Sequence, residues 1–278
     1  MGEHAQKRLI RKLDLERFLA TVAPQPNPQV HLEQYTVSEQ IAANMLYIAA
    51  HANDDVVGKS VLDLGCGTGR LALGASYLGA SEVVGVDIDR SAIQTASENK
   101  RKTGLGSIQW VLGDISAVAG CFDTVLQNPP FGVQTREADR AFLVKALQVG
   151  SSIYSLHSHP EVDARLIKQL KASQGFLRVS ASPFLERFIG QYGGSVSAVY
   201  AMVMTIPRMF DFHTKLKHDF VIDMYVIKKE CTLESQRVAG VSADKILDNG
   251  VYHFFAQTLA AWVSSRFGCP RLKKFHPP

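Results

Sequence analysis

Apolar positions recur with two spacings along most of the chain, and these spacings predict alternating strands and helices. The expected strands are the short apolar runs 61–64, 81–87, 108–112, 122–126 and 151–156. The expected helices, with apolar positions three or four residues apart, cover 38–51, 70–78, 90–102, 137–149 and 162–172. This alternation is typical of an α/β fold with a mostly parallel sheet. Two further apolar runs, 196–206 and 220–227, predict a closing antiparallel pair of strands.

The first 30 residues are expected to form a basic helix, over 1–22, and a proline-rich linker. The apolar residues of this helix suit one stripe, formed by Leu9, Leu13, Phe18 and Leu19. Arg11 and Lys12 flank the stripe and are candidates for contacts with phosphate. A solvated helix face is the alternative, which the sequence alone slightly favours. Two later helices have expected N-caps, Ser38 and Asp89.

The composition limits the size of the core and the kinds of partner, but it does not define a function. The chain has 278 residues, of which 46% are hydrophobic and 20% charged, so it can bury a full core. We expect three parts: the arm 1–30, a main domain over 31–230, and a mostly helical extension over 231–278. The net charge of +4 permits a nucleic-acid partner without requiring one.

The four cysteines form no Cys-x-x-Cys pair and no Cys/His set with zinc spacing, so we expect free thiols and no metal. No run of 18 apolar residues occurs, and the N-terminus has no apolar signal stretch. The sequence therefore predicts no membrane association and a cytoplasmic or nuclear location.

Candidate chemistry begins at the first expected strand, which runs into a glycine-rich loop. Asp63 lies in the strand, and Gly65, Cys66, Gly67 and Gly69 follow before the helix from residue 70. The glycines let the backbone turn tightly and approach a ligand. The spacing differs from that of the dinucleotide-binding fingerprint, and the carboxylate inside the strand would repel a pyrophosphate. A cationic cofactor suits it, and S-adenosylmethionine carries an ammonium and a sulfonium.

Acidic residues also end the next two strands. Asp87 follows Gly69 by 18 residues, and a carboxylate near this place accepts hydrogen bonds from ribose hydroxyls in nucleoside-binding folds. Asp114 could accept from an adenine amine with Ile115 packing on the ring, although a turn aspartate is an equal alternative. Ile88 stands directly after Asp87, between the two acids of 87–89.

The fourth strand ends in a corner, Asn128-Pro129-Pro130-Phe131. Two prolines fix two φ angles and cannot continue a central strand. The amide oxygen of Asn128 and the carbonyl of Pro129 can accept hydrogens from a planar amino nitrogen, and Phe131 offers a face for stacking. An Asn-Pro turn that merely closes the strand is the alternative. Ligands in such sheets bind at the carboxyl ends of the strands, where all these candidates fall.

The chain resembles the methyltransferase-like protein 5 family of ribosomal RNA adenine N6-methyltransferases. The resemblance rests on short blocks in order: Leu32-Glu-Gln-Tyr35, Ala42-Ala43-x-Met45-Leu46-Tyr47, Asp63-Leu-Gly-Cys-Gly67, Asp87-Ile-Asp89, Asn128-Pro-Pro-Phe-Gly132, Ala141-Phe-Leu143, Tyr154-Ser-Leu-His157 and Phe212-His-x-Lys215. It implies the fold class of the class I methyltransferases: a Rossmann-like sheet of seven strands, parallel except for one antiparallel strand, with helices on both faces.

The resemblance also implies an activity and a partner. The activity is S-adenosylmethionine-dependent methylation of adenine N6 in structured RNA, at one adenosine of small-subunit ribosomal RNA. The partner is a small zinc-binding activator protein. Gln34 and Tyr35 are expected over the cofactor cleft, although packing against the sheet is an equal alternative. Where the family has Pro-Thr after the tyrosine, this chain has Thr36-Val37, so Thr36 carries less weight.

Two surfaces are expected to meet the macromolecular partners. His157, and the loop residues His213, Lys215 and Lys217, are candidates for RNA contacts. A satisfied buried histidine and an exposed charged hairpin are the alternatives. The strand 108–112 is expected at a sheet edge and has no charge to protect it, so we expect the activator protein to add a strand there. Cover by the chain's own segment 231–278 is the competing possibility.

Two other functions remain open at this stage. A glutamine side-chain amide presents the same planar nitrogen, so a protein glutamine N5-methyltransferase fits the Asn128 corner. A non-catalytic RNA-binding assembly factor on a methyltransferase fold is the second alternative, which the intact corner and glycine loop oppose.

Overall fold

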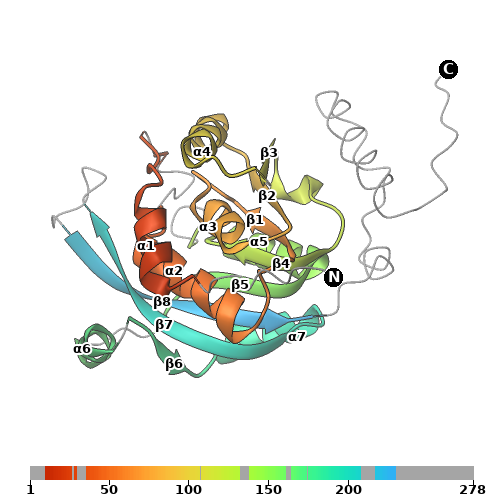
Figure 1. Cartoon of the computed structure of the whole chain (residues 1–278). Coiled ribbons are helices and arrows are strands. Elements are labelled where there is room, and N and C mark those ends of the chain that lie inside the picture. Colours follow the sequence, from red (N-terminus) through yellow and green to blue (C-terminus); the bar gives the residue numbers. More distant parts are fainter. Residues whose placement is uncertain are drawn as a thin grey trace, which may run out of the picture. The chain divides into compact units, whose positions relative to one another are not determined.

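The computed structural model describes residues 10–26, 28–29, 36–106, 108–131, 138–160, 164–173, 175–207 and 217–229. The chain divides into two compact units, Met1–Cys231 and Thr232–Pro278 (Figure 1). The second unit lies outside the described residues, and so does the helix expected near its end.

The core of the first unit is an eight-stranded sheet with the order β3-β2-β1-β4-β5-β8-β7-β6. The strands are β1 (Ser60–Leu64), β2 (Glu82–Asp87), β3 (Ile108–Leu112), β4 (Phe122–Gln127), β5 (Gly150–Ser158), β6 (Leu177–Val179), β7 (Ser195–Pro207) and β8 (Lys217–Lys228). The first five strands pair in parallel, and β8 pairs antiparallel to both β5 and β7. The predicted class of sheet is confirmed.

The predicted number of strands was wrong by one. The additional strand, β6, pairs antiparallel to β7 at the edge of the sheet. It contains only three residues, Leu177–Val179, so it shows too little alternation for a sequence pattern to reveal it. The helix that follows it, α7 (Pro183–Gln191), was also not predicted.

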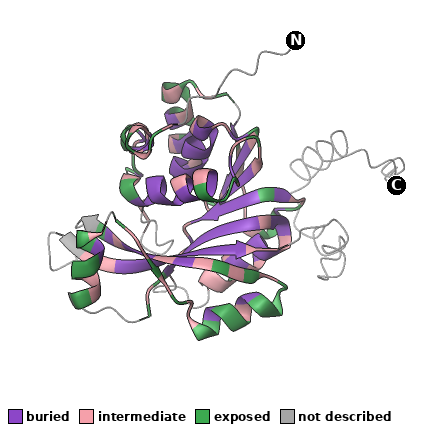
Figure 2. Cartoon of the chain, turned by 60° about the horizontal axis from the view of Figure 1, so that its bottom comes forward, coloured by how far each residue is buried: buried purple, intermediate pink, exposed green. Residues whose placement is uncertain are grey.

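Helices cover both faces of the sheet (Figure 1). The other helices are α1 (Lys12–Ala20), α2 (Glu39–Tyr47) with the π-helical turn η2 (Ile48–Ala52), α3 (Arg70–Leu78), α4 (Arg90–Thr103), the 3-10 turn η3 (Ile115–Ala117), α5 (Ala138–Val149) and α6 (Ala164–Ala172). Apolar residues of α1, α2 and α3 share one core cluster, and those of α5 and α7 share another. Between these layers the central strands are buried along most of their length (Figure 2).

The predicted N-caps are confirmed, but the apolar stripe of the first helix was wrong in part. Ser38 Oγ accepts from the Ile41 amide, and Asp89 Oδ1 accepts from the Ser91 amide at 2.9 Å. In α1, Leu15 and Leu19 are fully buried, whereas Leu13 is 51% exposed. Leu13 lies about 200° around the helix from Leu15, so the two cannot face the same core.

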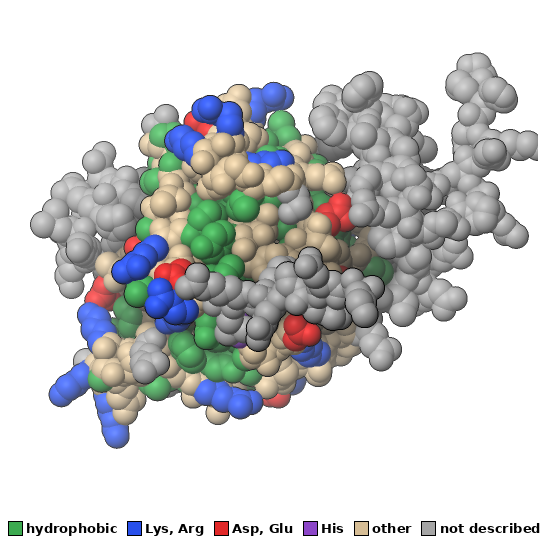
Figure 3. All heavy atoms as spheres, viewed as in Figure 1, with side chains coloured by type: hydrophobic (Ala, Val, Ile, Leu, Met, Phe, Trp, Pro, Cys, Tyr) green, Lys and Arg blue, Asp and Glu red, His purple; other side chains and the backbone are tan. Residues whose placement is uncertain are grey.

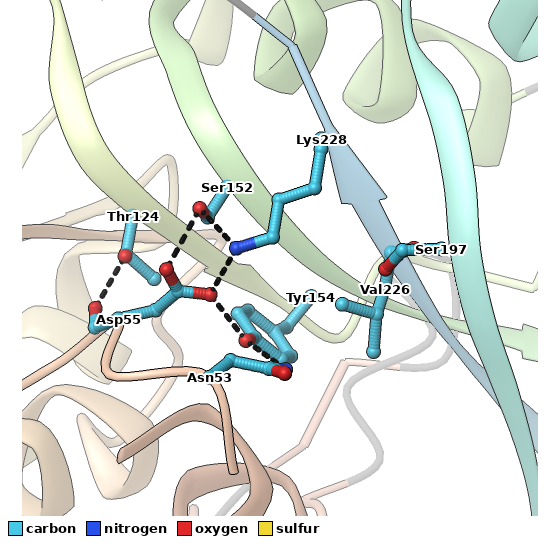
Figure 4. Close-up of polar contacts among 8 residues, drawn as sticks. All are labelled: Asn53, Asp55, Thr124, Ser152, Tyr154, Ser197, Val226 and Lys228. Carbon is cyan, nitrogen blue, oxygen red and sulfur yellow. Dashed lines mark hydrogen bonds and ion pairs between the residues drawn. The ribbon is translucent and has the colours of Figure 1, made fainter. Parts of the chain in front are cut away.

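A polar cluster ties the amino-terminal ends of the central strands together (Figure 4). Asp55, just before β1, accepts hydrogen bonds from Tyr154 Oη at 2.5 Å and from Ser152 Oγ at 3.0 Å. Lys228 Nζ lies 2.6 Å from the same carboxylate, and Asn53 Nδ2 donates to Tyr154 Oη at 2.7 Å. Tyr154, from the expected block Tyr154 to His157, is therefore structural: it lies in the middle of β5, and its hydroxyl reaches Asp55 before β1.

Candidate active site

A cavity of about 260 Å³ lies where the carboxyl ends of β1, β2 and β4 meet. The predicted site residues that line it are Asp63, Gly65, Cys66, Gly67, Asp87, Ile88, Asp114, Ile115, Asn128 and Pro130. They come from four different strand ends, and the parallel topology brings them to one edge of the sheet. These residues therefore line one cavity at the edge of the sheet where the sequence predicts a shared site.

Two positions in the loop after β1 require glycine, because the backbone there is left-handed and aromatic rings leave no space for a side chain. Gly65 has a φ of +72°, and an added Cβ would lie 2.7 Å from Cε1 of Phe142 in α5. Gly69 has a φ of +81° and is covered by the Trp110 ring from β3. Left-handed backbone is costly for other residues. The loop can therefore close tightly over the end of β1 and leave its backbone facing the cavity.

Asp63 places a carboxyl group beneath this loop. It is 1% exposed and accepts one hydrogen bond, from the Ala72 amide at 2.9 Å. Burial raises the pKa of Asp63 to about 7, because the charged form is poorly solvated. A cationic group bound beside it would favour the carboxylate, so the position suits a positively charged ligand.

Asp87 and Asp89 have different roles, as predicted. Asp87 lines the cavity, accepts from the Gly67 amide at 2.7 Å through Oδ2, and accepts from the Asp89 amide at 2.9 Å through Oδ1. The pKa of Asp87 is raised above its ordinary value, mainly because burial disfavours the charged carboxylate. Asp89 instead caps α4 through Ser91. Ile88, between them, is 59% exposed and also lines the cavity, so it offers an apolar surface to a ligand.

Asp114 is a turn aspartate that also lines the cavity. Its Oδ1 accepts from the Ser116 amide at 2.8 Å and so caps the η3 turn. Asp114 and Ile115 also line the cavity, beside the end of β3.

The Asn128 corner forms a wall of the same cavity. β4 ends at Gln127, and both Asn128 and Pro130 line the cavity, while Pro129 is buried. Phe131 is half-buried and meets Phe220 of β8 edge-on, with ring centroids 5.9 Å apart. The corner thus lies between the cavity and the start of β8.

The structure corrects the prediction for His157. It is 4% exposed, and its Nε2 lies 2.8 Å from Ser155 Oγ. Burial lowers the pKa of His157 to about 4, so the ring is neutral near pH 7. A buried, hydrogen-bonded ring cannot contact RNA, and the alternative of a satisfied buried histidine is the observed one.

The other predicted RNA-binding residues are only partly described. Arg11 is exposed and pairs with Asp14 at 2.8 Å, and Lys12 Nζ lies 5.9 Å from the centroid of the Phe176 ring. His213 and Lys215 lie outside the described residues. Lys217 begins β8, but its side chain is not described.

The segment expected over the cofactor cleft is also described only at its end. Gln34 and Tyr35 lie outside the described residues, whereas Thr36, which was expected to matter less, lines the cavity. Arg70, a further lining residue that was not predicted, is buried and donates to the carbonyl oxygens of Val37 and of Val22 (2.9 Å). Its position directly after the last glycine of the loop is the signal that could have identified it.

Gln25 and Phe142 are two more lining residues that the sequence analysis missed. Gln25 lies in the proline-rich segment and donates from Nε2 to Ser91 Oγ at 2.7 Å. Phe142 belongs to the block 141–143, whose role the sequence did not reveal. Within the described ranges, no group of three or more His, Cys, Asp or Glu residues is arranged to hold a metal ion. The helices described are all too short or too polar to span a bilayer.

Comparison with known proteins agrees with this geometry. A family described as "Methyltransferase domain" matches residues 55–205. A candidate RNA methyltransferase from Pyrococcus horikoshii has a similar crystal structure, with a TM-score of 0.66, 33% identity, and coverage of 79% of this chain and 98% of that one. The fold and the site therefore define a class I methyltransferase.

Sequence relatives show to which family of methyltransferases the chain belongs. An uncharacterized protein of Methanocaldococcus jannaschii is 34% identical over 80% of this chain and 95% of its own length. The rRNA N(6)-adenosine-methyltransferase METTL5 of Danio rerio is 32% identical over 76% of this chain and 95% of its own length. The chain belongs to the METTL5 family of methyltransferases, which confirms the resemblance found in the sequence.

Proposed function

We propose that the protein transfers a methyl group from S-adenosylmethionine to N6 of an adenosine in ribosomal RNA. The observation that carries the proposal is the position of Asn128, which lines the same cavity as Asp63, Gly65 and Asp87. The corner and the candidate cofactor residues therefore face one space. The relatives named rRNA N(6)-adenosine-methyltransferases support the choice of substrate.

The cavity fits S-adenosylmethionine in its chemistry. Asp63 and the glycine loop match the methionine end with its ammonium group, Asp87 matches the ribose hydroxyls, and Ile88 and Ile115 match the flat faces of adenine. Asp114 is placed to accept from the adenine amine. Gln34, Tyr35, Cys66 and Gly69 remain proposed contacts or supports of the same site.

Asn128, Pro129 and Phe131 would act on the target base. Bound S-adenosylmethionine supplies an electrophilic methyl group. The amide oxygen of Asn128 and the carbonyl of Pro129 accept hydrogen bonds from the adenine amine, and these bonds strengthen as N6 becomes positive during attack. Phe131 stacks on the base, which must leave its own helix to reach the site. N6 would bond to the methyl carbon as that carbon's bond to sulfur breaks, with S-adenosylhomocysteine as the leaving group. N6 would lose its proton to water afterwards, so no general base is required before attack.

Exposed basic residues of α6 support an RNA substrate over a protein glutamine. α6 carries Arg165 and Lys168 on its exposed face, and neither forms an ion pair within the described part of the chain. Figure 3 shows Lys and Arg side chains gathered at the lower left, where Figure 1 places α6. Together with Lys12, and with His213, Lys215 and Lys217 of the β7–β8 connection, these residues are proposed to meet the RNA backbone.

We also propose that a small zinc-binding activator protein adds a strand to β3. β3 is an edge strand in the described sheet, and Gln109 is exposed while Val111 and Leu112 are half-buried. The Trp110 ring faces inward, against Gly85 and Gly69. The edge therefore offers backbone groups and short apolar side chains, which strand addition would cover. The proposed location is the cytoplasm, the nucleus or both, and the proposed target is one adenosine of the small-subunit RNA.

Labelled methyl transfer tests the activity directly. The purified protein, with and without the activator, is incubated with labelled S-adenosylmethionine and ribosomal RNA or ribosomal proteins from cells that lack this protein. We expect label in RNA, released as N6-methyladenosine on digestion. Label confined to protein glutamine would favour the N5-methyltransferase, and no transfer to either would favour a non-catalytic assembly factor.

A further inference from the structure

A chain of buried polar side chains lies directly behind the Asn128 corner. Gln127 is the last residue of β4, and its Nε2 donates to Ser155 Oγ of β5 at 2.8 Å. Ser155 Oγ in turn lies 2.8 Å from His157 Nε2. Gln127 and Ser155 are fully buried and His157 nearly so. Because a serine hydroxyl both donates and accepts, the chain is continuous for either tautomer of the neutral ring.

The far end of this chain is anchored in the core. The His157 ring meets the Tyr225 ring edge-on, with centroids 5.3 Å apart. Tyr225 of β8 is 1% exposed, and its hydroxyl accepts from the amide of Ser182, the N-cap of α7, at 2.9 Å. The Gln127 side chain is thereby connected to β5, β8 and the start of α7.

The position of Gln127 at the end of β4 connects this series of hydrogen-bonded side chains to Asn128. Gln127 is the last residue of β4 that pairs with its neighbours, opposite Leu64 of β1 and Ser155 of β5. Asn128 follows at once, and the two prolines after it have no amide hydrogen with which to continue the ladder. The orientation of the corner therefore depends on how firmly Gln127 is held.

We propose that Ser155 and His157 are positioning residues for methyl transfer, which through Gln127 hold the Asn128 corner against the cavity. This inference rests on the proposed function. None of Gln127, Ser155 and His157 lines the cavity, so they act without touching the cofactor. The inference also explains why polar residues occupy a buried part of β5 at its carboxyl end.

The protein offers a matched control toward the amino-terminal end of β5. Ser152 is also buried, and its hydroxyl also has two polar partners, Asp55 at 3.0 Å and Lys228 at 2.9 Å. This group lies in the polar cluster of Figure 4, away from the corner. Ser152→Ala and Ser155→Ala remove the same atom from similar surroundings, and both should lower the melting temperature.

The two variants should differ in turnover. At a temperature where both are folded, we expect Ser155→Ala to lower kcat roughly 10- to 100-fold, the size expected when a reacting group is misplaced. Cofactor affinity and KM for RNA should stay within about twofold. Ser152→Ala should keep the wild-type kcat. Ser155→Thr, which keeps the hydroxyl, should recover most of the lost turnover.

A second variant covers the case in which Ser155→Ala does not fold. His157→Phe keeps an aromatic ring against Tyr225 but removes the hydrogen bond, and we expect the same loss of kcat. Combining both changes should cost no more than either alone, because they break one chain. If wild-type protein methylates RNA, and Ser155→Ala and His157→Phe lose no more kcat than Ser152→Ala, the inference is wrong. If wild-type protein does not methylate RNA, the proposed function fails instead.

Discussion

The carboxylate of Asp87, at the end of β2, accepts a hydrogen bond of 2.7 Å from the amide of Gly67, in the loop after β1. The residue expected to bind ribose therefore also holds the loop expected to bind the methionine end. The two halves of the cofactor site are linked by this bond before any ligand arrives. A preformed site loses less conformational entropy when it binds.

Replacing Asp87 should weaken cofactor binding strongly. Asp87→Ala removes both the ribose acceptors and the support of Gly67, and hydrogen bonds to a charged group contribute about 1.5–3 kcal/mol each. We expect the dissociation constant for S-adenosylmethionine to rise at least about 100-fold, measured by calorimetry. Asp89→Asn, which keeps a side-chain acceptor for the α4 cap, should bind normally. A folded Asp87→Ala protein with wild-type affinity would contradict the assignment.

Cofactor affinity should depend on pH through Asp63. The pKa of Asp63 is raised to about 7 in the folded protein, above its ordinary value, so folding retains a proton there. Its contribution to stability is complete below about pH 4 and is lost as the pH rises through about 7. Because a cationic ligand favours the carboxylate, affinity should instead increase from about pH 5.5 to about pH 7, with release of a proton.

Calorimetry in buffers of different ionisation enthalpy measures both the affinity and the proton release. Asp63→Asn removes the titrating group without changing its size, so its affinity should be lower and nearly independent of pH in this range. If the affinity of the wild-type protein fell as the pH rose, another group would be responsible for the titration. The same would follow if Asp63→Asn still released a proton on binding.

Gly65→Ala tests the loop. The substituted residue would retain a φ near +72° and place its Cβ 2.7 Å from the Phe142 ring. We expect the free energy of unfolding to fall by about 2–4 kcal/mol, from backbone strain and overpacking. Gly106→Ala is the control, because its added Cβ meets no atom within 4 Å. Equal stabilities of the two variants in urea titrations would show that the loop tolerates a side chain.

The site was more predictable from the sequence than the periphery of the fold. Asp63, Asp87 and Asn128 could be placed because each lies at or next to the carboxyl end of a strongly apolar strand, and parallel strands bring these ends to one edge. Leu13 was misplaced because the helix face is set by Leu15 and Leu19, which tertiary packing selects. β6 was missed because three residues carry no periodicity.

His157 shows a different limit of sequence analysis. A histidine at a strand end is compatible with either RNA contact or burial, and only its neighbours distinguish the two. Those neighbours, Ser155 and Tyr225, come from β5 and β8, and Tyr225 is far away in the sequence. The same holds for Arg70, whose carbonyl partners at 22 and 37 become visible only in three dimensions.

A proline in β3 should disrupt the proposed complex. Val111→Pro removes the amide that faces β2 and so distorts the edge strand, and the activator protein should therefore no longer co-purify. Arg178→Pro is the matched control, since β6 forms the other edge of the described sheet and should tolerate it. If Val111→Pro leaves the complex intact, and the isolated protein is monodisperse and active, strand addition at β3 is wrong.

The central claim is that the Asn128 corner carries the chemistry, and single-turnover methylation by Asn128→Ala tests it most directly. The assay measures N6-methyladenosine formed in ribosomal RNA at saturating S-adenosylmethionine, with cofactor affinity measured in parallel. Loss of one transition-state hydrogen-bond partner should lower the rate by about 10²–10³ while cofactor affinity stays within about twofold. A folded Asn128→Ala protein that methylates RNA at nearly the wild-type rate would contradict the account, because the corner would then be only a turn that ends β4.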